Sequence, residues 1–220
     1  MATPTRMSPV HDALLEYRPE WRECGGARIA WHYRSAAAND AALPALGLCD
    51  LSPLAKLGLT GPHASAWLQQ QGVPLPESIY DALRLDDNGW IVRFGRDEFF
   101  LESGLGSELI SKLDANLGRG RPGIARVERQ EATFLLTGAR ALEVLAQTCG
   151  IDFRELPPKQ LVISRVAGVN CCLLPEGDDK LPCYRIWVDP TYAVALWDSL
   201  AQISAELGGR LVGAAAIYER

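Results

Sequence analysis

Residues 50–73 read DLSPLAKLGLTGPHASAWLQQQGV, and residues 127–150 read VERQEATFLLTGARALEVLAQTCG. The two stretches align without a gap at the Leu-Thr-Gly triplets 59–61 and 136–138. In each stretch, apolar residues alternate before the Thr-Gly pair and return at helical spacing after it. Further identities in this alignment are Ala55 with Ala132, Ala64 with Ala141, and Leu68 with Leu145. The sequence therefore predicts an internal repeat of a strand, a glycine turn and a helix.

A hairpin and a second helix are predicted after each of these units. In the first half, the hairpin covers residues 90–101 and the helix covers 108–117. In the second half, the hairpin covers residues 169–188, and the helix begins at Asp189 with a proline at its first position. The apolar side of this last helix is predicted to comprise Tyr192, Leu196, Leu200 and Ile203. Both halves thus have the order strand, helix, hairpin, helix, which places the chain in the α/β (α+β) class.

The repeat divides the chain into segments. The two halves are expected at 46–118 and 124–207, joined by the glycine-rich residues 118–123, which lack the lysine and hydroxyl of a phosphate-binding loop. The N-terminal segment 1–45, which includes the polar run 36–40, and the tail 208–220 have a weaker pattern. Either could dock on a partner or be mobile.

Composition excludes several classes of protein. The 220 residues are 48% hydrophobic and carry a formal net charge of -5, so the chain can bury a core and has no basic field for nucleic acid. No apolar run is long enough to span a membrane, and the polar start of the chain lacks a signal-peptide core. We therefore expect a cytoplasmic location.

The cysteines and histidines do not form a recognisable metal motif. Six cysteines contain no C-x-x-C pair, and only three histidines accompany them, so we expect reduced and mostly buried thiols and no metal site. The pair Cys171-Cys172 lies in an apolar strand, where burial disfavours a thiolate nucleophile. Residues 31–33, Trp-His-Tyr, could line a binding site or form a partly buried packing cluster.

Several motifs resemble known proteins. Residues 47–52 (GLCDLS) and 59–64 (LTGPHA) resemble the stretch that opens the folate-binding domain of the glycine-cleavage T-protein, an aminomethyltransferase. Other motifs are similar to the gamma subunit of heterotetrameric sarcosine oxidase: FGRDEFFL at 94–101, LTGARALEVL at 136–145, CGIDF at 149–153, YRIWV at 184–188 and ALW at 195–197. This resemblance covers residues 46–206 and implies a two-lobed, aminomethyltransferase-like folate-binding fold.

The resemblance also implies partners and cofactors. Larger sarcosine oxidase-like subunits would hold FAD or FMN, NAD and tetrahydrofolate, and would oxidatively demethylate sarcosine or a related N-methyl amine. This chain would be a non-catalytic gamma-like subunit that holds no cofactor of its own. The alternatives are a stand-alone tetrahydrofolate-dependent aminomethyltransferase and a folate-binding regulatory module.

The T-protein family supplies the test for chemistry in this chain. That family has a catalytic aspartate in a paired Asp-Asp motif, but Asp86-Asp87 here precedes Asn88-Gly89, a dipeptide typical of hairpin turns. The family also has a folate-contacting glutamate in a Gly-Tyr-Thr-Gly-Glu motif, which this chain replaces with CLLPEGD at 172–178. The weak folate candidates are therefore Glu176 and the arginines Arg93, Arg126 and Arg165. Glu176 could in principle approach a folate amide, but we expect it to be a loop carboxylate in solvent, and we expect the arginines at the surface.

A subunit needs a contact surface. An exposed apolar patch would mark it, and the candidates are Trp21, Trp90, Trp187 and Trp197 if they are exposed and not part of the core.

Overall fold

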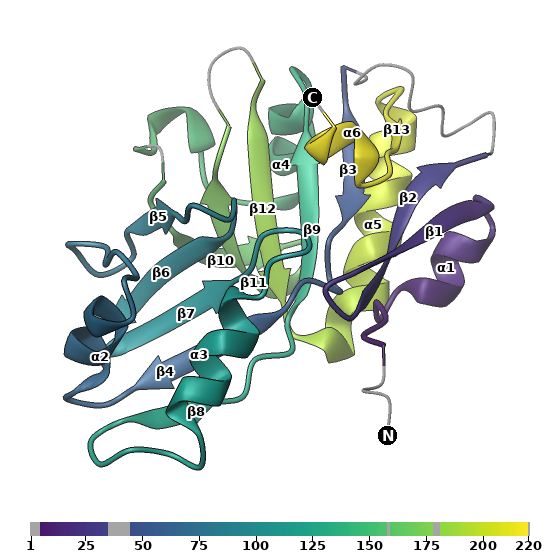
Figure 1. Ribbon diagram of the computed structural model, residues 1–220. Helices are drawn as coiled ribbons and strands as arrows, with labels where there is room; N and C mark the ends of the chain where they lie inside the picture. Colours follow the sequence, from purple (N-terminus) through teal and green to yellow (C-terminus); the bar gives the residue numbers. More distant parts are fainter. Residues whose placement is uncertain (1–4, 35–44, 158, 178–180, 220) are drawn as a thin grey trace. The chain divides into compact units, whose positions relative to one another are not determined.

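The computed structural model describes residues 5–34, 45–157, 159–177 and 181–219, which fall into two compact units. Unit 1 takes its residues from 1–53, 131–158 and 162–220, and unit 2 takes its residues from 54–130 and 159–161. Figure 1 gives the labels of the helices and strands. Each unit consists of one principal sheet with helices packed on it, which agrees with the predicted α/β (α+β) class.

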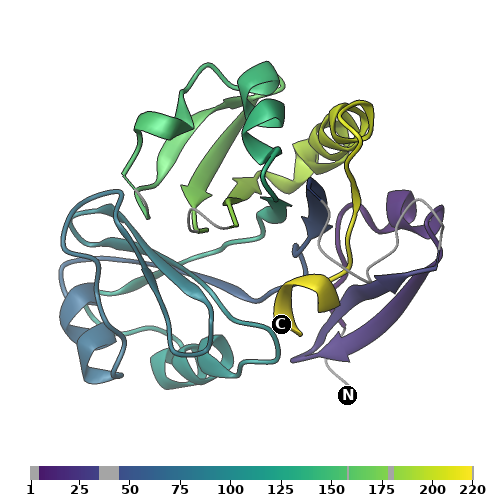
Figure 2. The ribbon, with the colours of Figure 1, turned by 90° about the horizontal axis from the view of Figure 1, so that it is seen from above.

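Unit 2 contains a five-stranded antiparallel sheet in the order β5-β6-β7-β4-β8. Its elements are β4 (Lys56–Thr60), α2 (Ala64–Gln70), β5 (Ala82–Arg84), β6 (Trp90–Gly95), β7 (Glu98–Glu102), α3 (Leu109–Leu117) and β8 (Ala125–Val127). Both helices lie on the same side of this sheet (Figure 2). The buried side chains of Leu59, Phe99 and Leu101 pack with Leu68 and Leu113 there. The apolar residues that alternate along the strands therefore lie against the apolar residues spaced along the helices.

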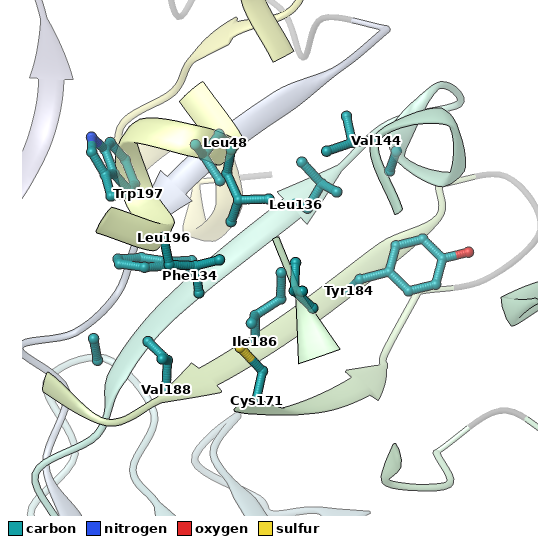
Figure 3. Close-up of a cluster of buried hydrophobic side chains, with 14 of the residues drawn as sticks. Leu48, Phe134, Leu136, Val144, Cys171, Tyr184, Ile186, Val188, Leu196 and Trp197 are labelled. Atoms are coloured by element: carbon teal, nitrogen blue, oxygen red, sulfur yellow. The ribbon is translucent and has the colours of Figure 1, made fainter. Parts of the chain in front are cut away.

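Unit 1 contains a six-stranded sheet in the order β10-β11-β12-β9-β3-β13. Its elements are β3 (Gly47–Asp50), β9 (Ala132–Thr137), α4 (Ala141–Thr148), β10 (Val162–Val166), β11 (Val169–Pro175), β12 (Cys183–Val188), α5 (Ala193–Glu206) and β13 (Arg210–Leu211). Two single turns of 3-10 helix, η1 (Phe153–Glu155) and η2 (Pro190–Tyr192), precede β10 and α5. Phe134, Leu136 and Ile186 of the sheet pack with Leu196 and Trp197 of α5 in an apolar core (Figure 3).

The described residues of the N-terminal segment and of the C-terminal tail form helices and strands in unit 1. α1 (His11–Leu15), β1 (Pro19–Cys24) and β2 (Ala27–Tyr33) precede the first repeat, and the tail supplies β13 and α6 (Ala215–Tyr218). β13 pairs in parallel with β3, and the Ala214 amide donates to the Ala30 carbonyl at 2.9 Å. The weak sequence pattern at both ends therefore reflects short elements that are tied down by pairing. Residues 36–40 lie outside the described residues.

The internal repeat is confirmed by the topology, although each half contains one strand, β5 or β10, that the predicted order of strand, helix, hairpin and helix lacks. The two halves have the same order of elements along the chain, β4-α2-β5-β6-β7-α3 and β9-α4-β10-β11-β12-α5. Equivalent strands also occupy the same spatial order in the two sheets. The repeats exchange one strand, since β3 leads into β4 but pairs with β9, while β8 leads into β9 but pairs with β4. The chain consequently passes between units after Pro53 and again after Gln130, which occupy the same position in the aligned repeat. This exchange is why the compact units do not coincide with the expected halves 46–118 and 124–207.

One expectation about an individual side chain is wrong, and three of the four conditional tryptophan candidates do not meet the condition of exposure. Tyr192 was expected on the buried side of the last helix, but it is 57% exposed because it lies in η2, where the Asp189 carboxylate caps the Thr191 amide at 2.8 Å. The side chains of Trp90, Trp187 and Trp197 are buried in the chain, so they form no exposed patch. Trp21 is half-buried and stacks on His11 with 4.6 Å between ring centroids.

Candidate functional site

A buried polar cluster of unit 1 lies on the face of its sheet that α4 and α5 do not cover. Along β12, Tyr184 and Ile186 enter the helix-covered core, so Arg185 between them points to the opposite face. The Arg185 residue is nevertheless only 1% exposed. A buried guanidinium must be paired, because removing its charge from water is costly.

Glu176 supplies the opposite charge. Arg185 donates from Nε to Glu176 Oε2 at 2.6 Å and from a terminal nitrogen to Oε1 at 3.0 Å, which is the fork-to-fork geometry that arginine and carboxylate favour. Glu176 directly follows β11, and its amide donates to the Cys183 carbonyl at 2.9 Å, which fixes its position beside β12. The Glu176 side chain is only 6% exposed, so the expectation of a solvent-exposed loop carboxylate is wrong. Its contact with folate stays a prediction.

A hydroxyl and a thiol complete this cluster. Thr137 of β9 lies opposite Cys183 of β12, and Thr137 Oγ1 is 3.0 Å from Cys183 Sγ. We call Glu176, Arg185, Thr137 and Cys183 the sheet cluster. The Arg185–Glu176 pair joins β12 to the end of β11, and the Thr137–Cys183 contact joins β9 to β12. Sequence reasoning missed Arg185, although a charged residue inside the apolar run YRIWV was a signal for a buried pair.

The candidate Arg93 joins two loops of unit 2 through hydrogen bonds from its side chain. Its guanidinium donates to the carbonyls of Gly95 at 3.3 Å, Pro76 at 3.1 Å, Glu77 at 2.8 Å and Arg96 at 2.7 Å. These bonds join the loop before β5 to the turn between β6 and β7. In this arrangement, the donors of Arg93 are directed at backbone oxygens.

The remaining arginine candidates also have local partners. Arg165 of β10 donates to Asn170, the residue directly opposite it on β11, at 3.2 Å. Arg126 of β8 pairs with Asp114 of α3. The structure places Arg165 and Glu176 in unit 1 and places Arg93 and Arg126 in unit 2. These residues therefore lie on separate strands and loops, each within its own intramolecular contacts.

The turn interpretation of residues 86–89 is confirmed. Asp87 accepts from the Gly89 amide at 2.7 Å and from the Gly104 amide at 3.2 Å, and Asn88 adopts a left-handed backbone with φ 64°. A Cβ on Gly104 would stand 1.6 Å from the Asp87 carbonyl oxygen, so these two loops touch backbone to backbone. Asp86 is exposed, whereas Asp87 is half-buried and its carboxylate binds these amides.

All six cysteines are free thiols; Cys49, Cys149 and Cys171 are buried, and the other three are half-buried. Burial raises the pKa of Cys171 to about 12, which agrees with the expectation that this strand disfavours a thiolate. In the described part of the chain, no group of three or more His, Cys, Asp or Glu residues is arranged to hold a metal ion.

Cys171 should resist thiol reagents that modify its neighbour. At pH 9 a thiol with a pKa of about 12 is ionised to only roughly 0.1%, so alkylation should reach half-buried Cys172 well before Cys171. Peptide mapping by mass spectrometry after timed alkylation of the native protein measures this difference. Equal rates at the two positions would contradict it.

The same thiol sets a pH dependence of stability. The folded state keeps a proton on Cys171 that the unfolded chain releases near pH 9, so this contribution to the unfolding free energy is complete below pH 9. It should be lost as the pH rises from about 9 toward 12. The variant Cys171→Ser, measured beside the parent protein, isolates this contribution because serine does not titrate in that range.

Residues 31–33 form a packing cluster, as one of the two expectations states. Tyr33 is buried, while Trp31 and His32 are half-buried neighbours on β2 with ring centroids 6.3 Å apart. The Arg22 guanidinium lies 4.2 Å from the Trp31 ring centroid, a cation–π contact across the β1-β2 pair.

No helix in the described residues is both long and apolar enough to cross a membrane.

No protein-family model matches the chain. Among curated proteins, it is 24% identical to an aminomethyltransferase of Saccharopolyspora erythraea over 97% of its length, and 20% identical to one of Alkaliphilus oremlandii over 96%. It is 25% identical over 92% of its length to the gamma subunit of a heme-dependent oxidative N-demethylase of Ectopseudomonas mendocina. The chain spans 62%, 61% and 56% of these three proteins, respectively.

Two solved structures share the fold. The aminomethyltransferase T of the glycine cleavage system from Bartonella henselae matches 96% of this chain with a TM-score of 0.73 and 18% identity, over 60% of its own chain. A chain of the heterotetrameric sarcosine oxidase from Corynebacterium sp. U-96, solved with pyrrole 2-carboxylate, matches 90% of this chain with a TM-score of 0.65 and 19% identity, over 94% of its own chain. These comparisons confirm the predicted aminomethyltransferase-like fold and the resemblance to a sarcosine oxidase-type gamma subunit.

Proposed function

We propose that this chain is a non-catalytic, gamma-like subunit of a sarcosine oxidase-type complex that oxidatively demethylates sarcosine or a related N-methyl amine. The sequence similarity to the gamma subunit of an oxidative N-demethylase carries this proposal. A chain of the heterotetrameric sarcosine oxidase has the same fold, with a TM-score of 0.65. The similarity to an N-demethylase gamma subunit over 92% of this chain points to the same class of complex.

The geometry of the candidate residues supports an accessory role. Glu176 forms a buried ion pair with Arg185, Arg93 binds four backbone carbonyls, and the Asp87 carboxylate binds the amides of a turn. Each of these polar groups stabilises the chain itself. Following the resemblance to sarcosine oxidase, we assign FAD or FMN, NAD and tetrahydrofolate to larger partner subunits, expect this chain to hold none of them, and place the complex in the cytoplasm.

A second candidate function is a stand-alone protein that binds tetrahydrofolate or transfers aminomethyl groups. It is favoured by the similarity to two aminomethyltransferases over 97% and 96% of this chain. The two functions differ in an observable way, because only the first requires stable association with flavin-containing subunits.

Purification of the tagged chain from its native cells separates the two candidates. We expect larger subunits to be recovered in constant proportion, identified by mass spectrometry, and the eluate to show flavin absorbance. The eluate should release formaldehyde from sarcosine or another N-methyl amine, while the isolated chain should release none. Recovery of a colourless monomer that binds tetrahydrofolate in calorimetry would reject the subunit proposal and favour the second candidate.

A further inference from the structure

The two Thr-Gly turns that identify the repeat make the same backbone contacts within their own halves. Gly61 and Gly138 have φ values of 122° and 108°, which few residues other than glycine adopt. The Gly61 amide donates to the Asp97 carbonyl at 3.0 Å, and the Gly138 amide donates to the Pro182 carbonyl at 2.9 Å. Asp97 lies between β6 and β7, and Pro182 lies between β11 and β12. Each turn therefore holds the hairpin of its own half.

A second contact of each turn reaches the other half of the chain. Two residues after the glycine, the His63 amide donates to the Gly123 carbonyl at 3.1 Å, and the Arg140 amide donates to the Ala45 carbonyl at 2.9 Å. Gly123 comes two residues before β8, and Ala45 comes two residues before β3. These are the two exchanged strands, which pair with β4 and β9 directly beside the turns (Figure 1). Each turn thus binds the backbone just ahead of the strand that arrives from the other half.

Glycine is needed at both aligned positions for this approach. A Cβ on Gly61 would stand 2.4 Å from the Gly123 carbonyl oxygen, and a Cβ on Gly138 would stand 2.4 Å from the Ala45 carbonyl oxygen. Non-bonded heavy atoms attract one another best at about 3.5–4.0 Å, so any side chain would push the incoming segment away. The repeated Leu-Thr-Gly triplet therefore marks two matching sites for an incoming strand.

The exchanged strands lie on opposite sides of the glycine-rich joint in the sequence. A cut within residues 118–123 would leave β3 on the N-terminal piece and β8 on the C-terminal piece. In unit 1, β3 of the first piece pairs with β9 of the second, and in unit 2, β8 of the second piece pairs with β4 of the first. The first piece also supplies α1, β1 and β2 to unit 1. Neither compact unit is complete without both pieces.

We propose that the two Thr-Gly turns are reciprocal strand-binding sites, which keep the two halves assembled even when the joint at 118–123 is cut. The ligand of each site is an extended segment that presents a backbone carbonyl to the turn and continues as an antiparallel strand beside it. The joint then raises the effective concentration of one half for the other, and it is not needed to hold the folded state together. The assembly of the two halves does not depend on the proposed function.

Cleavage of the folded, full-length chain tests the proposal. A recognition sequence for a site-specific protease is inserted between Gly120 and Arg121, which are both exposed. After complete cleavage, we expect the two pieces to elute together from a size-exclusion column in native buffer and to separate in urea. Two pieces that separate in native buffer would overturn the proposal.

Two substitutions show whether the turns hold the pieces together. In the cleaved protein, Gly61→Ala and Gly138→Ala should each raise the dissociation constant of the two pieces at least about tenfold more than Gly72→Ala does. Gly72 is the matched control, because it has φ 78° but an added Cβ there meets no atom within 4 Å. It therefore reproduces the cost of a left-handed alanine without the close approach. Equal effects of the three substitutions would reject the turns as binding sites.

Hydrogen exchange in the uncut chain gives a second readout, which is local. Gly138→Ala should speed the exchange of the β3 amides at least about tenfold and leave that of the β8 amides within about twofold, whereas Gly61→Ala should do the reverse. Mass spectrometry of peptides from the two strands measures both rates. An equal rise in both strands would mean that each substitution destabilises the whole chain, and the proposal would be wrong.

Discussion

Replacing Arg185 with methionine should lower the free energy of unfolding by about 3–5 kcal/mol. The substitution removes both guanidinium bonds to Glu176, whose side chain is only 6% exposed and stays between β11 and β12. A buried carboxylate that loses its cationic partner keeps its desolvation penalty without the compensating attraction. Urea denaturation, followed by circular dichroism and compared by midpoint, measures the loss.

The double variant Arg185→Met with Glu176→Met identifies the cause. If the penalty comes from the uncompensated carboxylate, removing both charges should recover most of the stability, because well-packed apolar pairs often replace buried ion pairs without loss. Arg165→Met serves as the control for loss of an arginine from the same sheet, since Arg165 binds Asn170 in an exposed contact. That variant should change the free energy by at most about 1 kcal/mol. A loss below about 1 kcal/mol in Arg185→Met would contradict the buried-pair account.

The repeat and its elements could be predicted because their signals are local. The triplets at 59–61 and 136–138 lie where β4 and β9 end, and the two helices that follow begin at Ala64 and Ala141, the aligned alanines of the repeat. The capping signal at Asp189 is also local, and the structure contains it. Alternation and capping depend on neighbours a few residues apart, so a single sequence carries them.

The exchange of β3 and β8 could not be predicted, because pairing partners are chosen by contacts between residues far apart in the sequence. β3 is followed at once by β4 but pairs with β9, and no local pattern distinguishes the two choices. The burial of Glu176 and its pairing with Arg185 were missed for the same reason. Glu176 is polar and near a turn, which favours solvent, and only the register of β11 against β12 places it beside Arg185. Likewise, tryptophan in a strand does not reveal which face it occupies.

Lys56→Met should be comparably severe in unit 2, with a loss of about 3–5 kcal/mol. Lys56 and Glu102 face each other across β4 and β7, their charged atoms are 3.2 Å apart, and their side chains are only 2% and 1% exposed. Lys56 Nζ also donates to the Leu54 carbonyl at 3.1 Å, at the point where the chain enters unit 2. Methionine keeps the length of the side chain, so the change removes charge and donors with little change in packing.

The chain contains an exposed lysine–glutamate pair that serves as the control for this prediction. Lys112 and Glu108 form the same type of pair on α3 at 3.3 Å, with side chains 70% and 74% exposed. Because water screens that contact, Lys112→Met should cost no more than about 0.5 kcal/mol in the same denaturation experiment. The two pairs share residue types and distance, so the difference between the two variants measures the effect of burial. Equal costs would mean that the Lys56 pair is as well solvated as the surface pair, and that packing alone, without the ion pair, holds β4 in register with β7.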